Sequence, residues 1–251
     1  MISVKPLCSP SLSTGASTAT TRRRVSPASS VKVSAKQIVE HVVLVRTKPG
    51  VEHSKINDML RNLYGLASLP QVRHLTTGPI LRTQSPAPAF THLFHSRYDS
   101  ASDLEEYNAH HLHLSVVRNY LFPIIDDIVV ADWISDDFSG STEVAPGSII
   151  RAKLLKLKEN LTENKKNQIV DVTKGLKRNF AQIEQLTVGG NIAEARTKGF
   201  SIASIGVFGG LDAVQALDAQ SAALSDQKDG VRGFVDDVLV VDYPVPAKAG
   251  C

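Results

Sequence analysis

The sequence predicts an α+β protein made of two tandem copies of one βαββαβ unit, with the sheets of the two copies packed face to face. Three observations support this prediction. The chain matches itself at an offset of about 110 residues. Strand-like and helix-like hydrophobic patterns follow one another in the same order in both copies. A segment containing Gly, Ser and Pro, residues 135–148, separates the copies as a linker would.

The internal match is clearest in three pairs of segments. They are VRHLTTG (72–78) with IEQLTVG (183–189), IIDDIVVADW (124–133) with FVDDVLVVDY (234–243), and HVVLVRTKPGV (41–51) with RAKLLKLKENL (151–161). We therefore predict a first domain over 37–134, a linker over 135–148, a second and divergent domain over 149–245, and a tail over 246–251.

The first copy contains four strand patterns and two helix patterns. Apolar residues recur at helical spacing from Ile56 to Leu66, and Pro70 ends that helix. In chain order the predicted elements are a strand His41–Thr47, a helix His53–Ser68, strands Val72–Ile80 and Phe90–Tyr98, a helical region 101–121 and a strand Asp127–Trp133. The loop between the two middle strands, GPILRTQSPAPAF (78–90), is predicted to be a flexible lip over a pocket.

The second copy repeats this order. Its predicted strands are Ile149–Leu157, Ile183–Ile192, Phe200–Phe208 and Asp237–Tyr243, and its second helix is 212–224. A split βαβ unit places both helices on one face of an antiparallel sheet and leaves the other face bare. Because a bare apolar face favours association, we expect the two halves to pair their sheets as an intrachain pseudo-dimer. Further pairing of two chains as a homodimer stays open.

Composition and charge exclude some classes of partner. The 251 residues are 42% hydrophobic and 21% charged, with a formal net charge of +3. This balance lacks the strongly basic character of nucleic-acid-binding domains. No apolar run reaches the roughly 18 to 20 residues that a transmembrane helix needs. We predict neither a nucleic-acid partner nor a membrane partner.

The first 36 residues differ in composition from the rest. Six basic residues precede Glu40, which is the first acidic residue, and without those six the formal net charge would be −3. The segment is rich in Ser and Thr and has no apolar core of a secretory signal. We interpret 1–36 as a disordered transit peptide for the plastid (chloroplast), with the peroxisome or the cytosol as alternatives. The only cysteines, Cys8 and Cys251, predict no structural disulfide in the mature protein.

Four motifs of the first copy resemble a known family. VEHVVLVRTKPGV, HLTTG, FTHLFHSRYDSASDLEEYNAHHLHLSVV and IIDDIVVADW occur in the order and spacing of the plant stress-response A/B barrel family, also called the dimeric alpha-beta barrel family. The resemblance includes two-domain members with an organellar leader. It implies tandem ferredoxin-like domains and no single reaction. We expect a stress-response protein that binds a small hydrophobic or aromatic ligand.

A polyketide cyclase of this family implies a catalytic alternative. Its active-site residues match His41, Tyr107 and His113. In that interpretation His113 is the general base, Tyr107 orients a carbonyl oxygen and His41 assists, so that a cyclase or isomerase would need no external cofactor. A further tyrosine of the cyclase falls at Leu63, with Tyr64 one residue away.

The histidines locate any such site in the first domain. All eight histidines lie in the first copy, and the positions matching His41, Tyr107 and His113 hold Arg151, Leu217 and Ala223. Two other interpretations stay open. The histidines and the tyrosine could serve only to hydrogen-bond buried backbone groups, or His110 and His113 could hold a metal from one helix face.

The family resemblance also implies a magnesium site. In a plant relative, backbone carbonyls hold the ion where the first helix ends, and the corresponding residues here are Ala67, Leu69 and Val72. Carbonyl oxygens are suitable ligands for hard cations. Side-chain identity cannot test such a site.

Overall fold

The structure is a computed structural model that describes residues 35–84, 90–223 and 231–246. The described residues belong to one compact unit. The predicted transit peptide over 1–36 and the tail over 246–251 lie almost entirely outside them, so both stay predictions. The described helices include none that is long and apolar enough to span a membrane.

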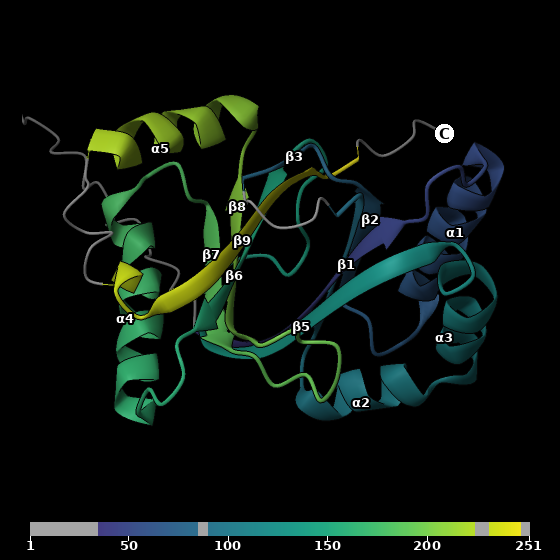
Figure 1. Cartoon of the computed structure of the whole chain (residues 1–251), viewed down its shortest axis with the longest axis horizontal. Helices are drawn as coiled ribbons and strands as arrows, with labels where there is room; N and C mark the ends of the chain where they lie inside the picture. The colour runs from purple at the N-terminus through teal and green to yellow at the C-terminus, as the bar shows by residue number, and fades with distance from the viewer. Residues whose placement is uncertain (1–34, 85–89, 224–230, 247–251) are drawn as a thin grey trace, which may run out of the picture. The chain divides into compact units, whose positions relative to one another are not determined.

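Both halves follow the predicted βαββαβ order (Figure 1). The first half comprises β1 (Lys36–Thr47), α1 (His53–Gly65), a short 3-10 turn (Leu66–Ser68), β2 (His74–Pro79), β4 (His92–Tyr98), α2 (Ala101–Ala109), α3 (His111–Val116), a π turn (Val117–Leu121) and β5 (Ile125–Phe138). The second half comprises β6 (Ile149–Leu157), α4 (Glu163–Asn179), β7 (Gln185–Gly190), β8 (Phe200–Phe208), α5 (Leu211–Ala223) and β9 (Val235–Pro244). The helical region predicted over 101–121 is interrupted at His110, whose extended backbone separates α2 from α3.

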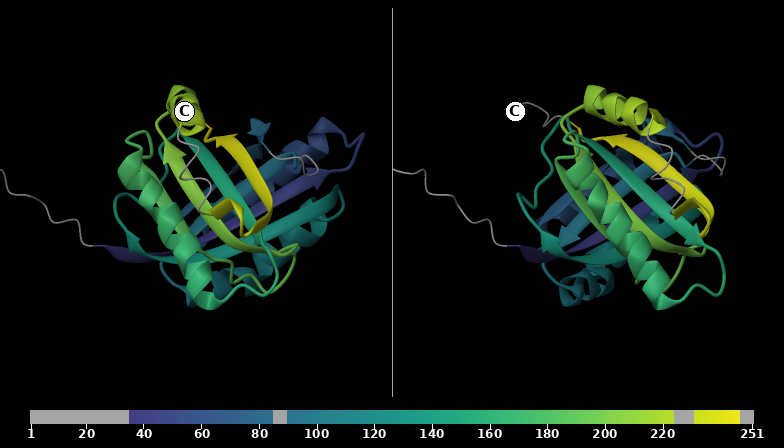
Figure 2. Two further views of the ribbon diagram at one scale, coloured as in Figure 1. Left: turned by 60° about the vertical axis from the view of Figure 1, so that its left-hand side comes forward. Right: turned by 90° about the vertical axis from the view of Figure 1, so that its left-hand side faces the viewer.

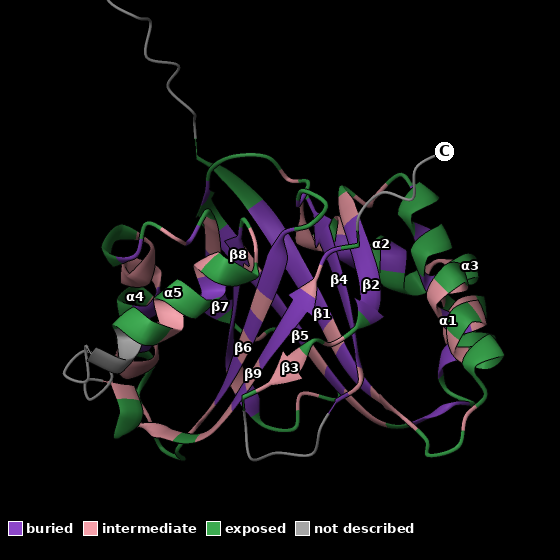
Figure 3. Ribbon diagram, turned by 90° about the horizontal axis from the view of Figure 1, so that it is seen from above, coloured by how far each residue is buried: buried purple, intermediate pink, exposed green. Residues whose placement is uncertain are grey.

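The strands form two antiparallel sheets. Sheet A has the order β2-β4-β1-β5, and sheet B has the order β3-β9-β6-β8-β7. Helices α1, α2 and α3 lie outside sheet A, and α4 and α5 lie outside sheet B (Figures 2 and 3). The short strand β3 (Arg82–Thr83) belongs to the first half but pairs with β9. The interpretation of 78–90 as a lip over a pocket is therefore wrong for its described part, which extends sheet B instead.

The inner faces of the two sheets share one apolar core. Along β1 the side chains of Val42 and Leu44 point to this core, whereas His41 and Val43 point to the helices, as the two-residue period of a strand requires. Trp133 of sheet A and Tyr243 of sheet B are both fully buried in it. The predicted intrachain pseudo-dimer is confirmed, and Figure 3 shows its buried strands between the two layers of helices.

Glycine allows the sheets to approach closely at two equivalent points. A Cβ atom on Gly189 of β7 would lie 2.9 Å from Trp133 Cβ and 3.0 Å from the Ile134 carbonyl oxygen. On β2, a Cβ atom on Gly78 would lie 3.2 Å from Tyr243 Cε2. Each half thus places a ring of its last strand against a glycine of the other half, which explains why both copies carry this glycine.

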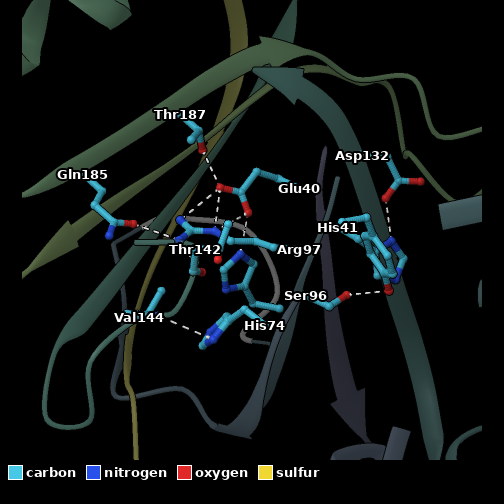
Figure 4. Close-up of polar contacts among 12 residues, drawn as sticks. Glu40, His41, His74, Ser96, Arg97, Asp132, Thr142, Val144, Gln185 and Thr187 are labelled. Carbon is cyan, nitrogen blue, oxygen red and sulfur yellow. Dashed lines mark hydrogen bonds and ion pairs between the residues drawn. The ribbon is translucent and has the colours of Figure 1, made fainter. Parts of the chain in front are cut away.

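A buried ionic cluster also joins the sheets (Figure 4). Glu40 on β1 pairs with Arg97 on the neighbouring β4, and both side chains are fully buried. His95 Nε2 lies 2.6 Å from Glu40 Oε2, and Thr187 of sheet B donates its hydroxyl to Glu40 Oε1 at 2.9 Å. Arg97 also donates to the Gln185 side chain of sheet B at 2.8 Å. Glu40 and Arg97 of the first half therefore neutralise each other, and neutral groups of the second half complete their hydrogen bonds.

The charge states in this cluster follow from its burial and its partners. Burial alone would raise the pKa of Glu40, but the charge of Arg97, the neighbouring His95 and their hydrogen bonds lower it from 4.5 to about 2. Burial lowers the pKa of His95, and it lowers the pKa of the adjacent His74 from 6.5 to about 3. Neutral histidines and an ionised Glu40 are thus the folded forms.

Gly189→Ala should destabilise the protein. The added methyl group would overlap Trp133 and the β5 backbone, so we expect the free energy of unfolding to fall by about 1 to 3 kcal/mol. Denaturant titration measures it. Gly65→Ala is the control, because a Cβ atom there meets nothing within 4 Å and alanine favours the helix. Stability equal to the wild type in Gly189→Ala would show that the sheets do not approach this closely.

Glu40→Gln should weaken the fold at neutral pH and flatten its acid sensitivity. The change leaves Arg97 buried without a charged partner, a loss of about 3 to 5 kcal/mol at pH 7. Because the folded-state pKa of Glu40 lies below 4.5, the stabilisation that its charge provides is complete above that pH and is lost as the pH falls towards 2.

The depressed pKa of His74 should make the wild type lose stability from about pH 6.5 downward, because the unfolded chain takes up a proton at this residue and the folded chain does not. Urea titrations between pH 7 and pH 3 test both, with exposed Glu159→Gln as the control; parallel curves for Glu40→Gln and wild type would contradict the assignment.

Candidate functional site

A cavity of about 540 Å³ lies between sheet A and the helices of the first half. This volume is within the range of cavities that hold small organic ligands. Most of its wall is apolar, with Val43, Met59, Leu63, Phe94 and Leu121 among the lining residues. Polar groups of β1, β5, α2 and α3 meet at one part of it.

His41 and Asp132 form the most polar part of the cavity. They lie opposite each other on β1 and β5, and His41 Nδ1 is 2.5 Å from Asp132 Oδ1 (Figure 4). A carboxylate can only accept, so Nδ1 carries a proton, and in the neutral ring Nε2 has the lone pair. Both side chains are buried and line the cavity. This arrangement fixes the tautomer and orientation of the imidazole, as a carboxylate does for a catalytic histidine.

Tyr107 and His113 face His41 from the helices. Ser100 caps α2 by accepting from the Asp103 amide, which fixes the start of the helix that carries Tyr107. The break at His110 then turns α3 towards Tyr107, and the centres of the His113 and Tyr107 rings are 4.6 Å apart. The centres of the Tyr107 and His41 rings are 6.3 Å apart. The structure therefore brings all three predicted residues to one cavity.

Their surroundings determine which groups can donate or accept. Burial raises the pKa of Tyr107, so its hydroxyl stays protonated. Burial lowers the pKa of His113, although the carbonyl of Asn108, 3.0 Å from Nδ1, raises it in part. His113 is then a neutral ring whose Nδ1 donates to Asn108 and whose Nε2 can accept.

Sequence reasoning missed Asp132 as a site residue. The signal was present, because Asp132 aligns with Asp242 in the repeat and interrupts an otherwise apolar strand. Only the pairing of β1 with β5 shows that it stands opposite His41. Also missed were His92, whose pKa burial lowers, and the second-half segment from Ile192 to Arg196, all of which line the cavity.

The candidate metal sites gain little support. Leu69 has a buried side chain, and its carbonyl already accepts from the Val72 amide at 3.0 Å. In the same turn the Arg73 guanidinium donates to the Pro70 carbonyl at 2.9 Å and to the Asp99 carboxylate. The magnesium site at Ala67, Leu69 and Val72 therefore stays a prediction.

The alternative of a histidine metal site gains no support from the described residues. His110 caps α3 with an extended backbone, and its Nδ1 accepts from the Leu112 amide at 3.2 Å. The Nδ1 atom of His110 is thus engaged in the cap, and that of His113 is engaged by the Asn108 carbonyl. Among the described residues, no three His, Cys, Asp or Glu side chains gather as a metal site would require.

The second half fills the corresponding position with ion pairs. Arg151 replaces His41 and donates to Asp242 at 2.7 Å and to Asp218 of α5 at 2.6 Å. Arg82, from β3 of the first half, contacts the same two carboxylates. Burial acts to lower the pKa of Arg151, but hydrogen bonds and charge from Asp242 and Asp218 raise it. The residues that line a cavity in the first half thus have counterparts here that satisfy one another.

Comparison with known proteins agrees with this duplicated architecture. A model of the stress responsive A/B barrel domain matches residues 39–135 and again residues 149–245. The chain is 47% identical over 213 residues to a stress-response A/B barrel domain-containing protein of Arabidopsis thaliana, and the match covers 85% of this chain and 81% of that protein. A second stress-response A/B barrel domain-containing protein of A. thaliana is 41% identical over 214 residues, with coverage of 84% and 99%.

One solved structure extends the comparison to the whole pseudo-dimer. The crystal structure of an anthrone oxidase-like protein superposes with a TM-score of 0.56 at 14% identity, and the match covers 87% of this chain and 98% of that chain. At this identity the superposition shows a common fold and nothing about the reaction.

Proposed function

This chain belongs to the stress-responsive A/B barrel family, and we propose that its first domain binds a small, mainly apolar, ring-containing molecule. One observation carries the proposal: the cavity has apolar walls and a polar end where His41, Tyr107 and His113 converge. Such a distribution orients a ligand by one polar group while the rest of its surface is buried.

The rim of the cavity favours a ligand without negative charge. Glu105 and Glu194 line it together with Arg196, which gives two carboxylates and one guanidinium. At the other end, the Tyr107 hydroxyl can donate and the histidine Nε2 atoms can accept. A neutral ring compound with a single hydroxyl, amine or carbonyl group matches both ends.

N-phenyl-1-naphthylamine, a neutral aromatic probe, should bind one molecule per chain with increased fluorescence. Val43 faces the cavity beside His41, and Val43→Phe fills that space, so we expect the affinity to fall about tenfold, or about 1.4 kcal/mol. Fluorescence titration measures it. Val172→Phe, on the exposed face of α4, is the control and should bind as the wild type does. Unchanged binding in Val43→Phe would place the probe elsewhere and remove support for the cavity.

The His41–Asp132 pair favours a second candidate function, proton transfer at carbon. The Nε2 atom of His41 would remove a proton next to a ketone carbonyl, and the Tyr107 hydroxyl would hydrogen-bond to the oxygen of the resulting enolate. Return of the proton to the same carbon gives exchange, and its return to another carbon gives an isomerisation. Attack of the enolate on a second carbonyl of the same molecule gives a cyclisation, in which the proton held by His41 passes to the new alkoxide. Because Asp132 fixes the tautomer and orientation of the His41 ring, this proposal assigns the base to His41 and the orientation of the substrate to His113.

Hydrogen–deuterium exchange of 2-indanone in D₂O tests this candidate. We expect loss of the α-proton signals in NMR spectra to be faster with protein than in buffer, because general-base catalysis contributes about 10²-fold or more. His41→Gln should return the rate to that of buffer, and His113→Gln should reduce it less. His53→Gln, at the exposed start of α1, should exchange as fast as the wild type. Exchange that survives in His41→Gln would rule out this base.

A further inference from the structure

A segment of the second half forms one wall of the first-half cavity. After β7 the chain runs along the outer edge of β5, which is the last strand of sheet A, and Figure 1 shows this green segment passing beneath β5. Ile192 N donates to the Asp132 carbonyl at 2.8 Å, and Val130 N donates to the Arg196 carbonyl at 3.0 Å. Residues 192–196 all line the cavity.

Asn191 attaches this segment to the residue that orients His41. Its Oδ1 accepts from the Asp132 amide at 3.0 Å, and its Nδ2 donates to the carbonyls of Val130 and Phe200. Together with the bond from Ile192, both backbone groups of Asp132 are held by the second half. The position of the Asp132 carboxylate, and through it the His41 ring, therefore depends on a residue outside the first domain.

The outer end of the segment is fixed on an aromatic ring at the cavity. The Arg196 guanidinium lies 5.1 Å from the centre of the Phe122 ring, and Phe122 also lines the cavity. Arg196 has a positive φ of 59°, a backbone conformation that a non-glycine residue adopts only when its surroundings hold it. The segment is thus held at both ends.

Each half extends an equivalent segment to the edge strand of the other half. Only the first-half segment places a side chain on the aspartate of that strand. Leu81 N donates to the Asp242 carbonyl at 2.9 Å, as Ile192 N does to Asp132. The residue after Leu81 is Arg82, whose guanidinium binds the Asp242 carboxylate. The residue after Ile192 is Ala193, whose methyl group leaves the Asp132 carboxylate to His41.

We infer that the ligand site is shared between the two halves, with Ala193 leaving the cavity open and Asn191 acting as a positioning residue for the His41–Asp132 pair. The inference rests on the ligand cavity proposed above. It extends that site to the second half, where Ile192 and the Arg196–Phe122 pair contact the outer end of a neutral aromatic ligand.

Ala193→Arg in the full chain tests the inference, because it copies Arg82 into the equivalent position. The new guanidinium should bind Asp132, displace His41 and reduce the affinity for N-phenyl-1-naphthylamine about tenfold or more. It should also shift or remove the downfield proton resonance of His41 Nδ1, which reports the bond to Asp132. Ala181→Arg, at an exposed position before β7, is the matched control and should change neither measurement.

Asn191→Ala provides the second variant. We expect a several-fold loss of affinity for the probe and a shifted His41 resonance, whereas exposed Asn167→Ala should leave both unchanged. Asn191→Asp keeps the acceptor for the Asp132 amide and should restore the resonance in part, which a general loss of stability would not do.

The outcomes separate the two proposals. If the wild type binds no probe, the ligand cavity fails, yet the His41 resonance still tests whether the second half holds the pair. If the wild type binds the probe and Ala193→Arg changes neither the affinity nor the resonance, the shared site is wrong.

Discussion

The structure depends on the burial of two bare sheet faces against each other. In each half the helices cover one face of a four-stranded antiparallel arrangement, and the other face carries apolar side chains that water would otherwise contact. Pairing the halves buries both faces at once. Because Gly78 and Gly189 admit the rings of Tyr243 and Trp133, the sheets pack closely enough to form one core.

The two-residue period of β1 separates structural from chemical roles. Glu40 points to the sheet interface, where Arg97 neutralises its charge and Thr187 donates a hydrogen bond to it. His41, the next residue, points to the helix side and the cavity. A polar cluster between the sheets lowers the stability of the fold unless every charge is paired. In this cluster Glu40 pairs with Arg97. Thr187 and Gln185 of the second half complete the hydrogen bonds. Neighbouring titratable residues therefore serve different purposes: one fixes the pairing of the halves and the other contacts the proposed ligand.

The sequence was sufficient for the features that repeat or alternate. The repeated segments and their periodicity predicted both βαββαβ units, the bare faces and their pairing, and the motif match brought His41, Tyr107 and His113 to one domain. The role of Asp132 needed the register of β1 against β5, and the break at His110 needed backbone angles that no residue type there demands. The interpretation of 78–90 as a lip was wrong for a physical reason: the Pro and Ser content of a loop carries no sign of which sheet edge will accept its amides.

The exchange of segments explains how a duplicated protein can keep one site and lose the other. Each half lays a segment across the edge strand of its partner, which protects that edge and locks the pseudo-dimer. The same contact brings the residue after Leu81 or Ile192 to the Asp of the other half. With Arg151 and Arg82 in place, Asp242 is saturated by guanidinium groups; with His41 and Ala193, Asp132 holds an imidazole beside an open cavity. The second half, which has no histidine, therefore contributes to the first-half site through its backbone, through Asn191 and through the side chains of residues 192–196.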